Sequence, residues 1–338
     1  MSGQLVSALA VVAVAAILNG SFAAPMKRMS GWQWENGWLL FALFGLVIFP
    51  WIVTVATVPH LAAVYQGASS STLLKVALFG VAWGAGATLF GLGIDRVGMA
   101  LGFSLILGMT ASFGSLFPMI ILHPDQLLAK RGLALILGTI IMIAGLVLLS
   151  LAGLARERDR GAGSSRQSGF TLGLVICIFS GIFSSMLNFS FVFGDELRVR
   201  ALDAGASLGM AANPIWALTV TAGSLANLIY CGYLLNKNRT WSAYGKGPVL
   251  TNWLLGISMG ALWFSGTALY GTGAAWMGSL GGIIGWPIFM TLDILVALLW
   301  GAVAGEWKGA SRRAYAYCWT GVFVLLAAIA MISAGNAA

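Results

Sequence analysis

The chain has 338 residues, of which 59% are hydrophobic and only 8% are charged, against about 25% charged residues in a typical soluble domain. Its mean hydropathy is +0.91. So little charge cannot cover a water-facing surface, so most of the surface must face lipid. The 45 glycines follow no triplet repeat and there are three cysteines, which excludes collagen and a disulfide scaffold. We therefore expect an all-α integral membrane protein.

The net charge of +8 does not indicate a nucleic-acid partner. The basic residues form no dense patch and lie between apolar stretches, as they do beside membrane spans. A spanning helix needs about 20 mainly apolar residues. We predict ten transmembrane helices, at 3–24, 36–58, 73–94, 98–122, 131–153, 170–192, 212–235, 248–271, 278–303 and 314–334.

The placement of lysine and arginine predicts the orientation of the chain. The connections that follow odd-numbered spans contain 13 of the 18 basic residues, and the other connections and the two ends contain the remaining five. Positive residues accumulate on the cytoplasmic side of a membrane. We therefore expect both termini to lie outside.

The two halves of the chain share three patterns in the same order, which indicates a duplication of five spans. The patterns are Leu18-Asn19-Gly20-Ser21-Phe22 with Leu187-Asn188-Phe189-Ser190-Phe191 at an offset of 169; Gly80-x-x-Trp83-x-x-Gly86-x-x-x-Phe90-Gly91-x-Gly93 with Gly260-x-x-Trp263-x-x-Gly266-x-x-x-Tyr270-Gly271-x-Gly273 at 180; and Leu149-Ser150-Leu151-Ala152-Gly153 with Met331-Ile332-Ser333-Ala334-Gly335 at 182.

Because five is odd, the second half must cross the membrane in the opposite sense to the first. Such a 5+5 inverted repeat is typical of secondary transporters, and its two halves supply the outward and inward states of alternating access. We predict a first five-helix repeat at 1–155, a basic cytoplasmic linker at 156–168 and a second repeat at 169–338. The matching amides Asn19 and Asn188 are expected to face each other across the pseudo-twofold axis.

Asp293 is the only one of the ten acidic residues that falls near the middle of a predicted span. An ionised Asp there costs about 2.5–3.5 kcal/mol, and burial favours its neutral form. We predict that Asp293 carries a coupled proton; the alternative is a hydrogen-bonded structural carboxyl. Pro287 lies six residues earlier in the same span. It is expected to kink or break the helix and to free backbone carbonyls.

Amides and tryptophans inside the spans are candidates for binding a sugar. Asn19, Asn188 and Asn227 offer both donors and acceptors to hydroxyl groups, or they bond helices together. Trp83 and Trp263 lie about ten residues into their spans, deeper than the interfacial aromatic belt. An indole ring can pack on the C–H face of a sugar while its N–H donates a hydrogen bond; ordinary core packing is the alternative.

Charged and aromatic residues near the span ends have simpler interpretations. Glu35, Lys27 and Arg28 share the first cytoplasmic connection, where they form either a gate contact or an interfacial salt bridge. We expect four further tryptophans at the lipid interface: Trp32, Trp34, Trp38 and Trp241.

No motif for covalent chemistry is present. The two histidines, His60 and His123, are far apart in the sequence and do not predict a metal site. There is no glycine-rich loop ending in Lys-Ser or Lys-Thr, so nothing indicates ATP as an energy source. We therefore expect a transporter without cofactor or metal rather than an enzyme.

Further motifs are spread over nearly the whole chain: Ala24-Pro25-x-Lys27-Arg28, Trp32-x-Trp34-Glu35, Phe79-Gly80-x-x-Trp83-Gly84, Gly98-Met99, Gly181-Ile182-Phe183-Ser184, Glu306-Trp307 and Arg312-Arg313. Together they resemble the L-rhamnose–proton symporter family of the drug/metabolite transporter superfamily. The resemblance implies ten helices in a bacterial inner membrane and import of a monosaccharide, L-rhamnose or a related deoxy sugar, with protons. Two alternatives stay open: transport of another small metabolite, and a membrane-embedded transferase. The oligomeric state is not indicated.

Overall fold

The computed structural model describes residues 3–97, 99–159 and 170–336. Every regular element within these residues is a helix. Ten segments of this described part of the chain are long and apolar enough to cross a membrane, which confirms the predicted fold class. Residues 160–168 of the predicted linker lie outside the described residues.

Eight of the ten spans are single α-helices whose bounds agree with the predicted ones to within six residues, the largest difference being at the end of span 5. They are α1 (Gly3–Gly20), α5 (Ser70–Val97), α6 (Met99–Leu122), α7 (Lys130–Asp159), α11 (Asn213–Asn238), α12 (Val249–Trp276), α13 (Gly281–Val303) and α14 (Arg312–Asn336).

Spans 2 and 6 are composite, which the sequence did not predict. A π-helical turn interrupts span 2 just before Pro50, which has no N–H for the regular hydrogen-bond ladder. Span 6 is interrupted at Ser185, whose hydroxyl donates to the carbonyl of Ile182. The segments are α2 (Trp34–Leu43), η2 (Phe44–Ile48) and α3 (Phe49–Thr57) in span 2, and α8 (Phe170–Ser184) and α9 (Met186–Phe193) in span 6.

Pro287 does not break its span. Helix α13 continues through it, and the hydroxyl of Thr291 donates to the carbonyl of Pro287. The sequence predicted a kink or a break at Pro287, and the break is absent from α13. The connections within the described residues contain five short helices: η1 (Ala24–Arg28), α4 (Leu61–Gly67), η3 (Pro124–Gln126), α10 (Asp195–Asp203) and η4 (Trp241–Gly245).

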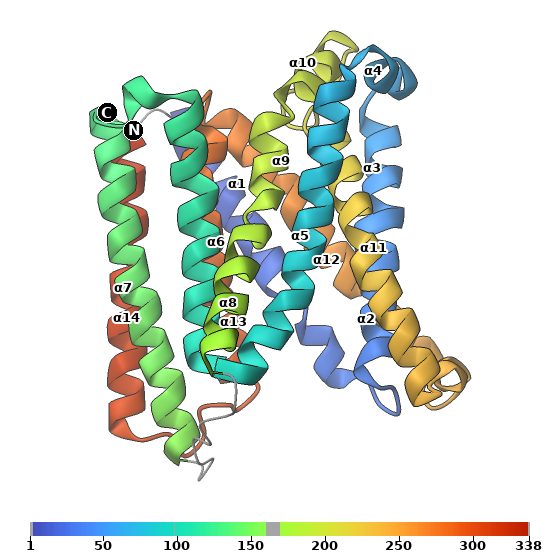
Figure 1. The fold of residues 1–338 in the computed structure, drawn as a ribbon, viewed down its shortest axis with the longest axis vertical. Helices are drawn as coiled ribbons and strands as arrows, with labels where there is room; N and C mark the ends of the chain where they lie inside the picture. The colour runs from blue at the N-terminus through green and yellow to red at the C-terminus, as the bar shows by residue number, and fades with distance from the viewer. Residues whose placement is uncertain (1–2, 98, 160–169, 337–338) are drawn as a thin grey trace.

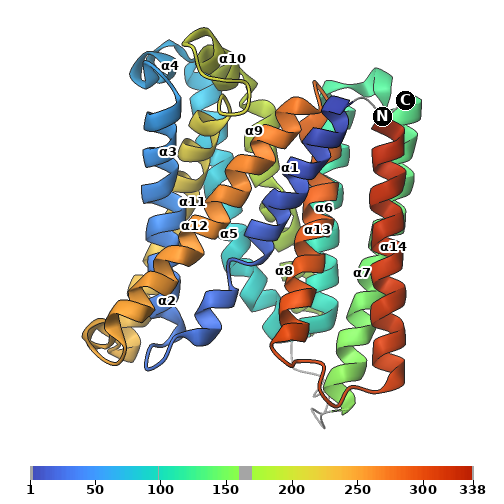
Figure 2. The same cartoon turned by 180° about the vertical axis from the view of Figure 1, so that it is seen from behind.

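The two ends of the helix bundle differ in what they carry. Helix α1 begins and α14 ends at the same end of the bundle as α4 and α10, on the other side of the molecule (Figures 1 and 2). We call this the terminal end. Helices α2 and α12 begin, and α7 ends, at the opposite end. Having both chain ends on one side is what an even number of spans requires.

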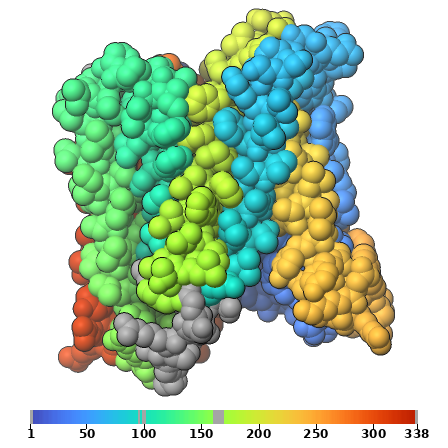
Figure 3. All heavy atoms as spheres, in the orientation of Figure 1, coloured from blue at the N-terminus to red at the C-terminus, as the bar shows by residue number. Residues whose placement is uncertain are grey.

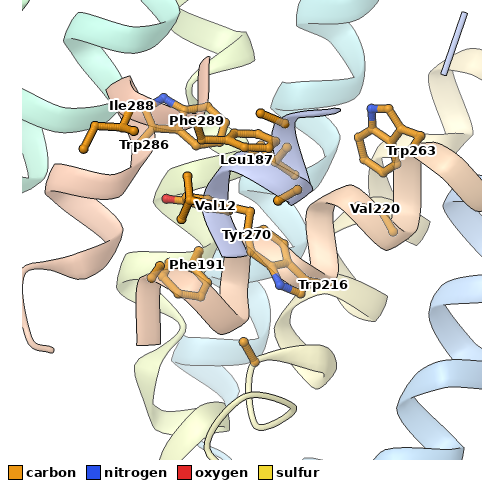
Figure 4. Packing of buried hydrophobic residues seen from close by; sticks show 14 of the residues in the cluster. Val12, Leu187, Phe191, Trp216, Val220, Trp263, Tyr270, Trp286, Ile288 and Phe289 are labelled. Carbon is orange, nitrogen blue, oxygen red and sulfur yellow. The ribbon is translucent and has the colours of Figure 1, made fainter. Parts of the chain in front are cut away.

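The core of the bundle is rich in aromatic rings. Trp216, Tyr270 and Trp286, from α11, α12 and α13, are almost fully buried there (Figure 4). Large aliphatic and aromatic side chains such as Ile229 and Phe323 are mostly exposed on the outside. That reversal is expected where the surroundings are lipid.

The packing of the helices is reciprocal between the two halves. Helix α1 packs on α12 and α5 packs on α8, which are span 1 with span 8 and span 3 with span 6. Helix α1 also contacts α13, as α8 contacts α6, and α5 contacts α11, as α12 contacts α2. Exchanging the halves converts each of these pairs into the other. Helices α7 and α14, spans 5 and 10, pair with each other at one edge (Figure 1).

Two glycine contacts repeat this reciprocity at the level of single residues. A Cβ atom on Gly93 would lie 2.6 Å from the sulfur of Cys177 in α8, and one on Gly273 would lie 3.0 Å from the carbonyl oxygen of Ala8 in α1. Gly93 and Gly273 are 180 residues apart, and Ala8 and Cys177 are 169 apart. These are the offsets of the sequence patterns, so matching residues make matching contacts.

Candidate functional site

A cavity of about 240 Å³ lies in the middle of the bundle, and we call it the central cavity. Its volume is below the 300–1,000 Å³ of pockets for drug-sized ligands, so it suits a small solute. It extends towards the opposite end of the bundle, because Trp38, near the start of α2, and Phe90, in the last turns of α5, both line it. Five of the residues predicted for the site line this cavity: Asn19, Trp83, Asn227, Trp263 and Asp293.

Trp83 and Trp263, the matching tryptophans of the two halves, stack on each other in the cavity wall. Their ring centroids are 5.4 Å apart and the planes are inclined by 28°. Gly223 makes room for the ring of Trp83, since a Cβ atom there would lie 2.5 Å from Trp83 Cε3. Neither indole N–H has a hydrogen-bond partner within the described part of the chain. The pair therefore offers the cavity an aromatic surface and two donors.

Two amides hold the walls of the central cavity together. Asn19 Nδ2 donates to the carbonyl of Trp263 at 3.1 Å and lies 3.4 Å from the hydroxyl of Thr267, so it ties α1 to α12. Asn227 Oδ1 accepts a 3.0 Å hydrogen bond from the indole of Trp38. The Oδ1 atom of Asn19 accepts no bond from the described residues and stays open to a ligand.

Among the described residues that line the central cavity, Asp293 is the only carboxylate. The same lining contains no lysine, arginine or histidine. Its Oδ1 atom is buried and has no hydrogen-bond partner in the described residues. Helix α1 comes very close here, because a Cβ atom on Gly20 would lie 2.7 Å from the Asp293 carbonyl oxygen. A carboxyl group so placed can hold a proton or take a hydrogen bond from a bound hydroxyl.

Asn188 does not line the central cavity, so the structure does not place it there beside Asn19. It lies one layer nearer the terminal end. Its Nδ2 donates to the carbonyls of Gly114 and Gly282 at 2.9 and 2.8 Å, and its Oδ1 accepts from the Tyr270 hydroxyl at 2.8 Å. These three bonds occupy the amide.

The prediction that Trp38 lies at the lipid interface was wrong. Trp38 lines the central cavity, donates to Asn227 and stacks on Trp34, whereas Trp34 and Trp241 are exposed on the surface. A signal was present in the sequence, because Trp38 and Trp216 are 178 residues apart, close to the offsets of the repeat. Sequence reasoning also missed several other lining residues: Phe41, Thr110, Tyr270 and Trp286.

The charged residues proposed for a gate have other partners than expected. Lys27 Nζ lies 2.6 Å from Glu306 Oε1, and Arg156 lies 3.2 Å from Glu306 Oε2. The hydrogen bond from Lys27, together with the charges of Lys27 and Arg156, holds the pKa of Glu306 below its usual value despite partial burial. Glu35 is buried and accepts hydrogen bonds from Asn238 and Thr240 instead.

Arg28 is exposed, and no salt bridge involves it within residues 3–97, 99–159 and 170–336. Within the same residues no group of three histidine, cysteine or acidic side chains could hold a metal ion. Glu306 lies in the connection between α13 and α14. Its ion pairs with Lys27 and Arg156 join this connection to η1 and to the end of α7, at the opposite end of the bundle.

A second cavity, of about 580 Å³, lies at the terminal end, and we call it the terminal cavity. It is lined by the end of α6, by α9 and α10, and by residues around Gly278 between α12 and α13. Its polar lining includes Asp195 and Arg198, which form a 2.6 Å ion pair. The surface in Figure 3 is notched at this end between the green α6–α7 side and the lime α9–α10 side.

Comparison with known proteins places the whole chain in one family. The sequence model of L-rhamnose-proton symport protein (RhaT) matches residues 1–338. L-rhamnose-proton symporters of Citrobacter koseri and Klebsiella pneumoniae strain 342 are each 29% identical, and that of Escherichia coli O1:K1 / APEC is 28% identical, over 94% of both chains. One crystal structure of a protein matches at 16% identity with a TM-score of 0.52, over 94% of this chain and 96% of that one, which shows a shared fold. The chain belongs to the L-rhamnose-proton symport protein family.

Proposed function

We propose that the chain imports L-rhamnose together with protons across a bacterial inner membrane, by alternating access. The family membership supports the substrate and the ion. The observation that carries the proposal in the structure is the central cavity, a small space with stacked indoles, amides and a lone carboxyl group in its wall. This combination suits a solute that has both hydroxyl groups and apolar C–H faces.

The orientation in this proposal places the terminal end outside. In the sequence, 13 of the 18 basic residues lie in connections that follow odd-numbered spans, and this supports the orientation. The central cavity then extends towards the cytoplasm, and the terminal cavity opens towards the periplasm. The structure would thus correspond to a state that faces inward.

Two five-helix halves, 1–155 and 169–338, provide the mechanical basis of the proposal. The reciprocal packing of α1 on α12 and of α5 on α8 supports a pseudo-twofold axis in the membrane plane. If each half can adopt the conformation of the other, the inward-facing state has an outward-facing counterpart. A sugar bound near the axis then stays in place while access changes around it.

The sugar site in this proposal lies beside the tryptophan pair. Trp83 and Trp263 stack on each other, so the sugar does not enter between them and packs on a ring edge or outer face. The free indole N–H groups and Asn19 Oδ1 then bond its hydroxyls. Asn227 supports Trp38 at the side of the cavity that faces the opposite end.

Asp293 carries the proton in this proposal. None of the described residues that line the cavity is a cation that could neutralise it. The charged form therefore needs water or bound hydroxyls, while the neutral form tolerates a closed and drier site. Proton loading and sugar binding in one cavity are then linked, because each changes the free energy of the other.

Uptake into proteoliposomes tests the proposal. With an inward proton gradient, we expect L-rhamnose to accumulate, and a protonophore to abolish the accumulation. D-glucose, an amino acid and a nucleoside, supplied separately, serve as controls for the substrate class. Accumulation of one of these in place of L-rhamnose would favour a different metabolite, and rhamnose uptake that ignores the proton gradient would reject symport.

A further inference from the structure

One layer of side chains separates the central cavity from the terminal cavity. Tyr270 lines the central cavity, and Ala274, one helical turn further along α12, lines the terminal cavity. Four residues of helix correspond to about 6 Å. Gly282 also lines the terminal cavity, and its carbonyl oxygen lies 3.1 Å from the Tyr270 hydroxyl. This layer is what closes the path towards the terminal end.

A buried hydrogen-bond network holds the layer closed. The Tyr270 hydroxyl donates to Asn188 Oδ1, and Asn188 Nδ2 donates to the carbonyls of Gly114 and Gly282. The four residues come from α12, α9, α6 and α13. The side chains of Asn188 and Tyr270 are at most 1% exposed, and three bonds satisfy the amide. A network of this kind joins four helices only while the layer is shut.

An aromatic seal backs the network on the terminal side. The ring centroid of Phe191 lies 5.7 Å from that of Tyr270, and Phe191 stacks on Trp216 with centroids 5.1 Å apart. All three side chains are labelled in Figure 4. Helix α13 fits against it tightly, since a Cβ atom on Gly282 would lie 2.8 Å from Phe191 Cε1. The seal excludes water, which makes the buried hydrogen bonds costly to break.

The repeat places a different residue at the corresponding position of the first half. Phe90 stands 180 residues before Tyr270. It lines the central cavity and packs edge-to-face on Phe103 at 5.0 Å. Asn19 is the counterpart of Asn188. If the halves exchange conformations, Phe90 and Asn19 come to close the path on the other side. Phe90 has no hydroxyl, so that barrier lacks the bond that Tyr270 provides.

We infer that Tyr270 and Asn188 form the outer barrier of the transport path, and that the Tyr270/Phe90 difference makes this barrier stronger than its inner counterpart. The unloaded protein therefore favours the inward-facing state. This inference rests on the alternating access proposed above, and it assigns Asn188 to the barrier rather than to direct contact with sugar. Tyr270 is a positioning residue: its hydroxyl sets the balance between the two states.

A cysteine that reports access to the central cavity from outside tests the barrier. Ala87 lines that cavity and is half-buried, so Ala87→Cys is the reporter. The native Cys177, Cys231 and Cys318 are buried, and replacing them with alanine removes background labelling. The measurement is the rate at which a membrane-impermeant maleimide labels the full chain in right-side-out and in inside-out vesicles, without sugar.

Tyr270→Phe removes one buried hydrogen bond at constant ring size. We expect labelling from outside to become about three- to tenfold faster. Phe90→Tyr adds the hydroxyl to the inner counterpart, and we expect it also to speed labelling from outside by a similar factor, while labelling from inside does not become faster because the inward-facing state still predominates. A loss of fold cannot produce that second result. Tyr315→Phe, which removes a tyrosine bond to the Trp307 carbonyl away from both cavities, is the matched control and should label as wild type.

Unchanged labelling in both Tyr270→Phe and Phe90→Tyr would overturn the barrier. Faster outside labelling in Tyr270→Phe alone would overturn the asymmetry between the two halves. Rhamnose uptake by the same vesicles separates these failures from that of the proposed function. Normal uptake without labelling shifts rejects only the barrier, whereas the expected shifts in a chain that moves no rhamnose reject only the substrate.

Discussion

Asp293 has the two properties that a proton-coupling carboxyl group needs: it lies in the wall of the central cavity, and one of its oxygens has no hydrogen-bond partner in the described part of the chain. Asp293→Asn mimics the neutral form with similar size. We expect the variant to bind sugar, to lose the pH dependence of that binding and to leave some exchange, while accumulation against a gradient is abolished. Binding across a pH series and counterflow in proteoliposomes measure these effects.

Asp125→Asn is a suitable control, because Asp125 is an exposed carboxylate in η3. It should accumulate sugar as wild type does. Uphill uptake by Asp293→Asn at the wild-type level would make Asp293 structural. The proton would then have to be carried by a carboxylate outside the central cavity, such as Glu35.

The stacked tryptophans provide a second test at the level of single residues. Trp263→Phe keeps an aromatic ring but removes an indole N–H that has no partner among the residues described by the structure. We expect about a three- to tenfold weaker affinity for L-rhamnose, the size of one hydrogen bond and part of one ring contact. Trp83→Phe should act in the same direction. Isothermal calorimetry on the purified protein measures both.

Trp319→Phe is the matched control, because the side chain of Trp319 is 60% exposed on the outside of α14. It should bind sugar as wild type. Unaltered affinity in both Trp83→Phe and Trp263→Phe would show that the pair is packing only, and that the sugar binds elsewhere in the cavity.

At the level of helices, close glycine contacts fix how the two halves cross. A Cβ atom on Gly80 in α5 would lie 2.2 Å from the carbonyl oxygen of Thr219 in α11, whereas one on Gly91 in the same helix meets nothing within 4 Å. We expect Gly80→Ala to lower the free energy of unfolding by about 1–3 kcal/mol, because backbone must move. Gly91→Ala should be neutral or stabilising, since alanine favours helix.

Thermal unfolding of the two glycine variants in detergent makes this comparison within one helix. Because Trp83 lies one turn after Gly80, a shift of α5 should also weaken sugar binding in Gly80→Ala. Equal melting temperatures for the two variants would contradict the tight crossing of α5 and α11.

The ion pairs of Glu306 tie three elements together at the opposite end of the bundle. Lys27 and Arg156 lower the pKa of Glu306 from its ordinary 4.5. The ion pairs therefore stabilise the folded protein fully above pH 4.5, the ordinary pKa of the carboxyl group. This stabilisation is lost as the pH falls through the lower pKa that Glu306 has in the folded state. We expect the melting temperature to fall less steeply in acid for Glu306→Gln than for wild type. Identical acid profiles would show that the pairs contribute nothing.

The sequence predicted the spans well but not their interruptions. The ten spans could be predicted because they depend only on local composition, apolar stretches flanked by charges. That composition is the same whichever helices pack against one another. The π-helical turn before Pro50 and the break at Ser185 depend on local backbone bonding that many other prolines and serines in helices do not cause. Pro287 shows the reverse case, since α13 continues through it.

The candidate site was predictable where the repeat pointed to it. Trp83 and Trp263 were paired by a shared pattern and do stack. Trp38 was misassigned because its position near a span end suggested the lipid interface, while its actual environment depends on the distant Asn227. Asn188 could not be placed by symmetry with Asn19. In a single conformational state the two halves differ, so these matching amides have different hydrogen-bond partners.

For the whole molecule, the orientation decides which cavity faces which compartment, and it rests on the unequal distribution of lysine and arginine. Two exposed positions at opposite ends report it. Leu128 lies between η3 and α7 at the terminal end, and its side chain is 79% exposed. Ser242, in η4 at the other end, is also exposed.

We expect an impermeant maleimide to label Leu128→Cys in intact cells and to label Ser242→Cys only after the membrane is permeabilised. The physical reason is that basic residues resist transfer across the energised membrane, so the connections that follow odd-numbered spans, which contain 13 of the 18 in the sequence, stay in the cytoplasm. The native cysteines are buried and should add little signal. The reverse labelling pattern would place the terminal end in the cytoplasm. The layer around Tyr270 would then close the inner side, and the state described here would be the one that receives sugar from outside.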